Sequence, residues 1–256
     1  MSIQNDVSEA EWQVRVELAA CFRLLDIYGM SDHTSSHAAV RVPGEPEYFL
    51  VNPFGWLFDE ITASSLVKVD LDGRIQDGGK INGSGYTVHG AVLAARDDVN
   101  CSIHTHTRAN VAVASMADGL LPLSQHSLQF FERTSYHDYD RHTDEMKRLQ
   151  QDLGQNWAMM LRNHGVLVAG RTVSEAFQFT QRLEIAEIRR RHDQLSQREC
   201  EVLGQMMDGQ LNKQIAHTLG ISQRTVEVHR ANVMDKMQAP SLADLVKQVM
   251  RLRDPG

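Results

Sequence analysis

Three histidines in two short segments carry the residue types of a metal site. His104 and His106 lie two residues apart within 100–107, and His164 follows the apolar run 157–161. If 100–107 forms a strand, both side chains point to one face, because strand side chains alternate with period 2. Imidazole nitrogens held in this way can share one divalent metal ion, usually zinc. The pair alone fits two surface histidines equally well, and the third histidine favours the metal site.

Apolar periodicity predicts the elements that must position these histidines. Residues 9–28 repeat apolar side chains at three- and four-residue steps, and Gly29 can end this helix. Strands and helices follow one another after it, which predicts a three-layer α/β/α domain over residues 9–192. The expected strands are 40–42, 48–51, 66–70, 100–107, 157–161 and 166–169. The expected helices are 9–28, 86–96, 109–116, 144–153 and 173–192.

Composition limits the class of protein. With 256 residues, 42% of them hydrophobic, the chain is long enough for one large domain or two smaller ones. No apolar run approaches the ~20 residues of a membrane helix, and three separated cysteines fit a reducing cytoplasm. We therefore expect a cytoplasmic protein without a membrane partner. The net charge is −7, yet residues 194–256 carry 8 Lys and Arg against 7 Asp and Glu. This shift in charge predicts two parts with different partners.

Several separated motifs over residues 9–192 resemble the class II aldolase/adducin head family, and most closely its adducin-like bacterial members. They occur in the family's order and are Asn52–Gly55, Asp59–Val67, the His-Thr-His-Thr segment 104–107, Tyr136–Tyr139 and Arg162–Gly165. The resemblance implies an α/β/α sandwich around a mixed sheet, assembled as a homo-oligomer. It also implies Zn2+, or another divalent metal, held by His104, His106 and His164. In the enzyme members, such a metal stabilises the enediolate of a small hydroxy-carbonyl compound.

The usual proton carrier of that chemistry is missing. In the aldolase members, a glutamate of a Ser-Ser-Glu turn lies four residues before the histidine that matches His89. Here that turn reads Gly83-Ser84-Gly85, and glycine cannot transfer protons, so ordinary aldol cleavage is not expected. Ser84, His37 and His89 are candidate substrate-binding residues, although the two histidines fit structural hydrogen-bonding roles equally well. Replacement acids or bases could come from Tyr136, His137 or Glu132.

From Leu195 onward the sequence predicts a small helical domain. Ser196 can cap a helix, and Glu199, three residues later, completes a capping box. Residues 220–222 form a tight turn between two further helices, which is the pattern of a helix-turn-helix. With a fourth helix at 241–250, residues 195–256 should form an all-α, four-helix domain.

This tail resembles the LuxR-type DNA-binding domain, in particular its FixJ-like branch. The resemblance rests on Asn212–Ala216, Gly220–Ser222 and Thr225–Met234. It implies double-stranded DNA as a partner, with 223–236 as the recognition helix in the major groove. Residues at or near base-reading positions are Glu227, Val228, Arg230 and Ala231, and candidate phosphate contacts are Lys213, Arg224, Thr225 and Lys236. A solvated helix face is the alternative for any one of them.

Three functions follow from these features. The leading hypothesis is a DNA-binding transcriptional regulator whose aldolase-like domain supplies oligomerisation, as a dimer or tetramer, or senses a ligand through the metal. The alternative is a zinc-dependent lyase or epimerase acting on a small, sugar-like hydroxy-carbonyl compound, with an accessory DNA-binding tail. The third is a structural interaction module like the adducin heads, which use the fold without catalysis.

Overall fold

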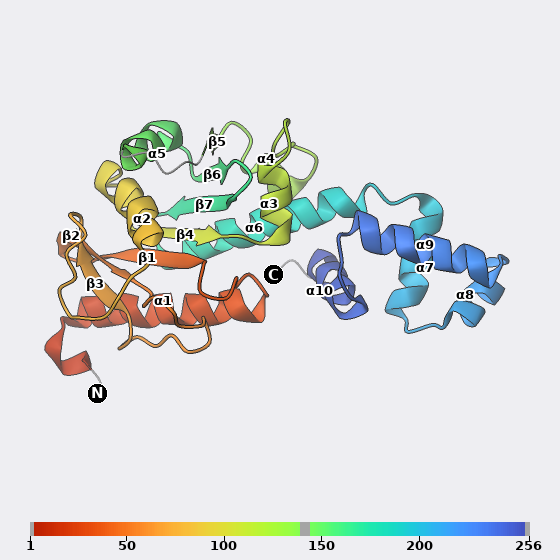
Figure 1. Cartoon of the computed structure of the whole chain (residues 1–256), viewed down its shortest axis with the longest axis horizontal. Coiled ribbons are helices and arrows are strands. Elements are labelled where there is room, and N and C mark those ends of the chain that lie inside the picture. The colour runs from red at the N-terminus through yellow and green to blue at the C-terminus, as the bar shows by residue number, and fades with distance from the viewer. Residues whose placement is uncertain (1–2, 139–143, 254–256) are drawn as a thin grey trace. The chain divides into compact units, whose positions relative to one another are not determined.

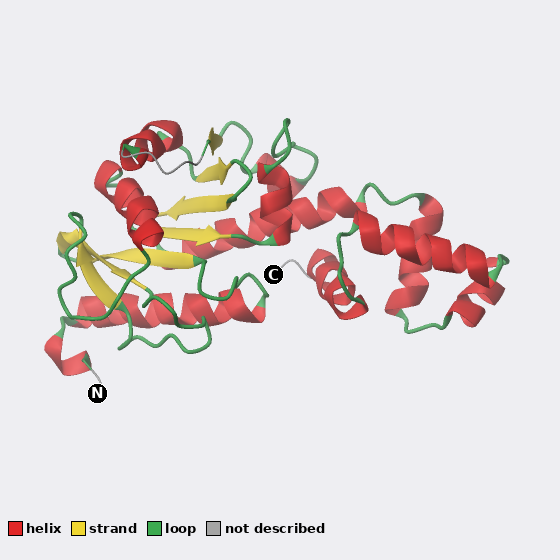
Figure 2. Ribbon diagram, viewed as in Figure 1, coloured by secondary structure: helices red, strands yellow, loops and turns green. Residues whose placement is uncertain are grey.

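The computed structural model describes residues 3–138 and 144–253, which fall into two compact units (Figure 1). The first unit comprises the described residues up to 122 together with 127–184, and the second comprises 123–126 and those from 185 onward. The first is a sheet with helices, and the described part of the second is helical without strands (Figure 2). The predicted α/β domain and small all-α domain are therefore confirmed. Within the described ranges, no helix is long and apolar enough to cross a membrane.

Seven strands form one mixed sheet in the order β3-β2-β1-β4-β7-β6-β5. Neighbouring strands run antiparallel except β5 and β6, which are parallel. The strands are β1 (His37–Val42), β2 (Glu45–Val51), β3 (Val67–Asp70), β4 (Cys101–Thr105), β5 (Thr134–His137), β6 (Ala158–Leu161) and β7 (Gly165–Gly170). The central strands β4 and β7 are buried along their whole length, as expected for strands covered on both faces.

Helices cover both faces of this sheet. The helices that begin in the first unit are α1 (Glu9–Ile27), α2 (Gly83–Ala95), α3 (Arg108–Ala114), α5 (Glu145–Leu153) and α6 (Val173–His192). Two short elements complete the N-terminal part, η1 (Gln4–Asp6) and α4 (Gln125–Leu128). Cys101 and Ile103 of β4 share a core with α1, whereas Met159 and Leu161 of β6 share a second core with α2 and α5. Two cores on opposite faces make the three layers.

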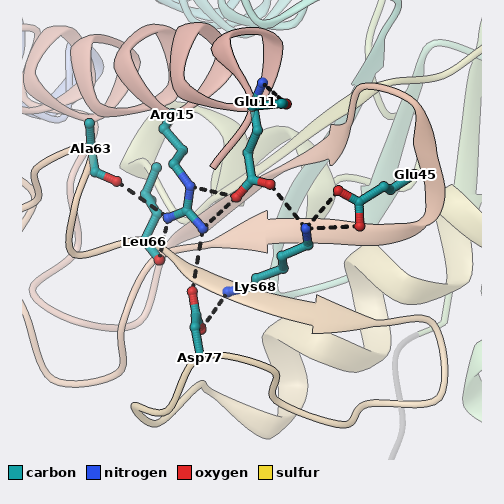
Figure 3. A network of polar contacts seen from close by, with 8 residues as sticks. Glu11, Arg15, Glu45, Ala63, Leu66, Lys68 and Asp77 are labelled. Carbon is teal, nitrogen blue, oxygen red and sulfur yellow. Dashed lines mark hydrogen bonds and ion pairs between the residues drawn. The ribbon is translucent and has the colours of Figure 1, made fainter. Parts of the chain in front are cut away.

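A buried ion-pair network holds the start of α1 on the sheet (Figure 3). Arg15 Nε donates to Glu11 Oε1 at 2.9 Å, and Arg15 also donates to the Leu66 carbonyl at 2.8 Å. The other Glu11 oxygen accepts from Lys68 Nζ in β3 at 3.0 Å. Glu11 and Arg15 are only 2% and 1% exposed, so each depends on its partner, because an unpaired buried charge is strongly destabilising.

Three local features differ from the sequence expectations. Helix α2 begins at Gly83, three residues before the expected start, because Asn82 Oδ1 accepts the Ser84 amide hydrogen at 3.1 Å and caps the helix. Strand β1 begins at His37, three residues before the expected start at residue 40. Strand β5 was not expected, since its four residues are mostly half-buried at the sheet edge and show no alternation of polar and apolar types.

The second unit packs four helices around one core. They are α7 (Gln197–Met207), α8 (Asn212–Leu219), α9 (Gln223–Lys236) and α10 (Leu242–Arg253). The end of α6 belongs to the same core through Ile185 and Ile188. Glu187 and Arg191, which are 0% and 2% exposed, form a buried ion pair at 3.2 Å in this part of α6. The last turns of α6 are therefore structural parts of the second unit.

Candidate metal centre and DNA-binding surface

Strand β4 and the turn between β6 and β7 bring the three predicted metal ligands together. His104 is buried in β4, His106 follows the last residue of this strand, and His164 lies in the turn. The turn approaches β4 closely because residue 165 is glycine. A Cβ at Gly165 would lie 2.5 Å from the Thr105 carbonyl oxygen and 2.9 Å from the His106 ring. A larger residue at this position would force the turn, β4 or the His106 ring to shift.

The Nε2 atoms of the three histidines converge. His104 and His106 are separated by 2.8 Å, and each lies 3.2 Å from His164. Nδ1 of His104 is 2.8 Å from the Val166 carbonyl oxygen, so it donates, and Nδ1 of His106 is 3.1 Å from a carboxylate oxygen of Asp32. In neutral rings, both donations leave the Nε2 lone pairs facing one another.

Such facing lone pairs repel unless a cation lies between them. Two nitrogens bound to zinc at about 2.0–2.1 Å in a tetrahedral arrangement lie about 3.3 Å apart. The two spacings to His164 are close to that value, the spacing between His104 and His106 is shorter, and the ligand atoms of the three histidines all lie within 4.8 Å of one another. The donor set therefore fits one divalent ion.

Burial favours the neutral imidazoles that bind metals. Burial and the charges of nearby histidines lower the pKa of His104 well below its ordinary value. Burial, with a smaller effect of His106, lowers the pKa of His164 to about 4. Because a metal ligand must be deprotonated, both rings are ready to bind at neutral pH.

A cavity of about 430 Å³ opens beside the three histidines. Its lining includes His37 and Ser84, two of the predicted substrate-binding residues, together with Asp32, Asn82 and Asn163. The third, His89, is fully buried and supports His37: its Nε2 is 2.8 Å from His37 Nδ1, and its Nδ1 is 2.7 Å from Ser102 Oγ. Burial lowers the pKa of both histidines, that of His89 to about 3.

Gly85 lies in the first turn of α2, beside His37. A Cβ at this position would be 3.2 Å from His37 Cγ and Cδ2, which is tighter than ordinary van der Waals contact. The backbone is therefore close to the cavity where the aldolase resemblance places a glutamate. Three candidate nitrogen ligands lie together, and the position of the usual proton carrier holds no side chain.

The candidate acids and bases Tyr136 and His137 lie in β5, at the edge of the sheet. Strands β7 and β6 separate them from β4, and neither residue lines the cavity. The two ring nitrogens of His137 are 2.7 Å from carboxylate oxygens of Glu145 and Asp152. The Tyr136 hydroxyl accepts the backbone amide hydrogen of Leu120 at 2.9 Å. Within one chain, both side chains make hydrogen bonds away from the three candidate metal ligands.

Glu132, the third candidate, is exposed, has a φ of 57° and also lies outside the cavity lining. Tyr139, the last residue of the Tyr136–Tyr139 motif, is outside the described residues. Conversely, sequence reasoning missed Asp32, which lines the cavity and contacts His106. Asp32 lies between the expected helix 9–28 and the expected strand 40–42, and its contact with His106 joins residues 74 apart in the sequence, so no local pattern indicated it.

Helices α8 and α9 and the turn between them form the expected helix-turn-helix. Gly220 ends α8 in the left-handed conformation with a φ of 63°, and Ser222 Oγ caps α9 by accepting the Thr225 amide hydrogen at 3.0 Å. Arg224, Glu227, Val228 and Ala231 are exposed on α9, and Arg230 is half-buried beside them. Val228 is 54% exposed, and its methyl groups suit a contact with a thymine methyl group.

The two lysines predicted to contact phosphate differ in their surroundings. Lys213 is exposed at the start of α8. Lys236 Nζ lies 2.6 Å from Glu199 Oε2 and 3.2 Å from the Gln194 carbonyl oxygen. The hydrogen bond from Lys236, followed by one from the Ser196 amide, lowers the pKa of Glu199 to about 2. A phosphate contact by Lys236 would therefore compete with this intramolecular pair.

Comparison with known proteins identifies both parts. The family model described as the class II aldolase and adducin N-terminal domain matches residues 16–187, and the model of bacterial regulatory proteins of the luxR family matches residues 193–249. A Caulobacter vibrioides protein with an aldolase class 2 name is 48% identical over 182 residues, covering 69% of this chain and 71% of that protein. Rat alpha-adducin is 42% identical over 186 residues, which are 70% of this chain and 25% of adducin.

Solved structures agree on the fold. The crystal structure of an aldolase II superfamily protein from Pseudomonas syringae matches with a TM-score of 0.72 and 38% identity, covering 96% of this chain and all of that chain. The L-fuculose 1-phosphate aldolase of Glaciozyma antarctica PI12 matches with a TM-score of 0.64 at 23% identity, covering 96% of this chain and 88% of that chain, and shows the fold alone. The chain belongs to the class II aldolase and adducin family, and a LuxR-type DNA-binding domain follows its aldolase-like domain.

Proposed function

We propose that the protein is a DNA-binding transcriptional regulator whose aldolase-like domain binds a divalent metal, zinc in the first instance, and serves as a ligand-sensing or oligomerising module. One contrast carries the proposal. The helix-turn-helix presents an exposed face on α9, whereas the metal-type cavity has Gly85 in place of the expected proton carrier. Self-association would present two DNA-binding domains to paired half-sites and raise the affinity for DNA.

The residues of the cavity are suited to holding a ligand. His104, His106 and His164 would hold the metal, which supplies Lewis-acid polarisation of a hydroxyl or carbonyl oxygen. His37, supported by His89, and Ser84 offer hydrogen-bonding groups to a small hydroxy-carbonyl compound. Among the described lining residues, the single carboxylate belongs to Asp32, which contacts His106. This arrangement supports binding more than proton transfer.

DNA binding is tested with the full chain and a duplex selected by that chain from a random pool. Fluorescence anisotropy should show affinity that falls linearly with salt on logarithmic axes. Replacing Arg230 with Ala should weaken binding by roughly 1–3 kcal/mol, as expected for the loss of a base contact. Lys247→Ala is the matched control, because it removes an exposed positive charge from α10. If no duplex binds in a salt-dependent way, the regulator proposal is wrong.

A metal-dependent lyase or epimerase acting on a small hydroxy-carbonyl compound is the second candidate, favoured by the complete set of three histidines. Turnover of such a compound by the metal-loaded protein, abolished by His106→Ala, would support this function. Turnover that persists in the variant would contradict it. A wild-type protein that binds no metal would rule out both the enzyme and metal-based sensing, and would leave oligomerisation as the role of the domain.

A further inference from the structure

The two histidines of the His-Thr-His segment are oriented in different ways. His104 lies within β4, and its Nδ1 is fixed by a backbone oxygen, that of Val166 in the paired strand β7. His106 lies beyond the last residue of β4, where the strand ladder no longer holds the chain. Its Nδ1 is 3.1 Å from Oδ2 of Asp32, a side chain from the loop between α1 and β1. The Nδ1 side of the His106 ring is therefore held by one side chain 74 residues away in the sequence.

We propose that Asp32 is a positioning residue of the metal centre, holding His106 with its Nδ1 protonated so that Nε2 faces the metal. The inference rests on the proposed metal site and assigns it a partner outside the three ligands. A carboxylate that accepts the second N–H of a ligand histidine fixes its tautomer and increases its basicity. Removal of such a partner typically weakens metal binding by about 10–100-fold.

The loop around Asp32 is built to present this side chain. The backbone carbonyl oxygen of Asp32 accepts the Ser35 amide hydrogen at 2.8 Å, and the next residue, His33, has a φ of 45°. Ser31 Oγ, on the other side, donates to Asp26 Oδ1 at 2.9 Å. The carboxylate is 44% exposed and lines the cavity, so a substitution leaves the cores intact. A loss of metal affinity can thus be separated from a loss of folding.

Metal affinity is measured on the full chain by titrating Zn2+ against a chromogenic chelator. Asp32→Ala should lower the affinity by about 10–100-fold, with an unchanged unfolding temperature of the metal-free protein. Asp32→Asn keeps an oxygen acceptor and loses the charge, so its affinity should lie between those of wild type and Asp32→Ala. Asp59→Ala is the matched control: Asp59 is exposed and shares a second hollow with Asp32, but no contact joins it to His106. Equal losses of zinc affinity in Asp32→Ala and Asp59→Ala would show that the loss comes from removing any nearby negative charge, and would overturn the proposal.

A second measurement does not need metal. Nitrogen-15 NMR of labelled histidines, at mildly alkaline pH where imidazoles are neutral, distinguishes the two tautomers. His106 should be the Nδ1–H tautomer in the metal-free wild type and a mixture in Asp32→Ala. The same tautomer in both proteins would overturn the role of Asp32 even if zinc binds. If the wild type binds no zinc but the two proteins still differ in tautomer, the metal centre is refuted and only the hydrogen bond between Asp32 and His106 is supported.

Discussion

Gly85 is the residue at which this chain departs most clearly from the enzymes that it resembles. Its position beside His37 makes the departure structural as well as chemical. A Cβ would press on a ring that His89 already holds from another side at 2.8 Å. Restoring a side chain at this position therefore requires His37 to move.

A pair of glycines in one helix turn tests this. Gly85→Ala should destabilise the first unit, because overpacking costs about 1–3 kcal/mol, more than the ~1 kcal/mol gained by replacing a helical glycine with alanine. Gly83→Ala, with no atom within 4 Å of the added Cβ, should be neutral or slightly stabilising. Thermal unfolding followed by tryptophan fluorescence measures both, since all three tryptophans (Trp12, Trp56, Trp157) precede residue 185. Equal effects of the two substitutions would contradict the tight contact at His37.

The sequence predicted that the three histidines lie together, but it did not predict that Asp32 contacts one of them. The His104/His106 pair follows from the period of a strand, which is a local property, and His164 lies at a glycine-containing turn between two apolar runs. Asp32 reaches His106 through tertiary packing alone, so no spacing along the chain reports it. For the same reason, the sequence could not show whether Tyr136 and His137 lie near the three histidines. Only the strand order shows that β5 is separated from β4 by β7 and β6.

Among the elements, α7 is stabilised by the hydrogen bonds of its first turn. Glu199 accepts the Ser196 amide hydrogen at 2.8 Å in the predicted capping box and also binds Lys236 from the end of α9. The capping box could be predicted because its two residues are three apart. The link to α9 could not be predicted, and it gives Lys236 a partner within the domain that a DNA phosphate would have to displace.

The Lys236–Glu199 ion pair makes the stability of the second unit fall at acid pH. The folded-state pKa of Glu199, about 2, is depressed below its ordinary value of 4.5, so its stabilisation is complete above about pH 4.5 and is lost as pH falls toward 2. Lys236→Met removes the largest cause of the depression. The variant should be less stable than wild type at neutral pH, and the difference should vanish toward pH 2. Guanidinium unfolding followed by helical circular dichroism measures it, with tryptophan fluorescence as the internal control for the first unit. A difference that persists unchanged at pH 2 would assign the effect to packing.

For the whole molecule, the charge difference and the change in sequence character correctly predicted two parts. The fold class could be predicted because alternating strands and amphipathic helices leave few ways to bury both faces of a sheet. The sequence alone could not show that α6 contributes to both units, because no residue pattern within this continuous helix indicates where one unit ends and the next begins. In the structure, Ile185 and Ile188 lie in the core of the second unit, and Glu187 pairs with buried Arg191.

We therefore expect the minimal folded DNA-binding fragment to begin before residue 185. A fragment of residues 195–256 should be largely unfolded, because a domain of this size is marginally stable and each deleted core isoleucine is worth about 2–5 kcal/mol. A fragment of residues 184–256 should give the dispersed amide spectrum of a folded domain. Folding of the shorter fragment would show that the end of α6 is dispensable.

The shared helix also restricts how such a chain can be assembled from parts. A LuxR-type domain joined at residue 193, where its family model begins to match, would lack the two isoleucines and the Glu187–Arg191 pair supplied by α6. The aldolase-like partner must therefore end in a helix whose outward positions suit the incoming domain. Exchange of the DNA-binding domain between relatives should give soluble chimeras when the last turns of α6 are transferred together with the domain. Transfer of the domain without these turns should give insoluble chimeras.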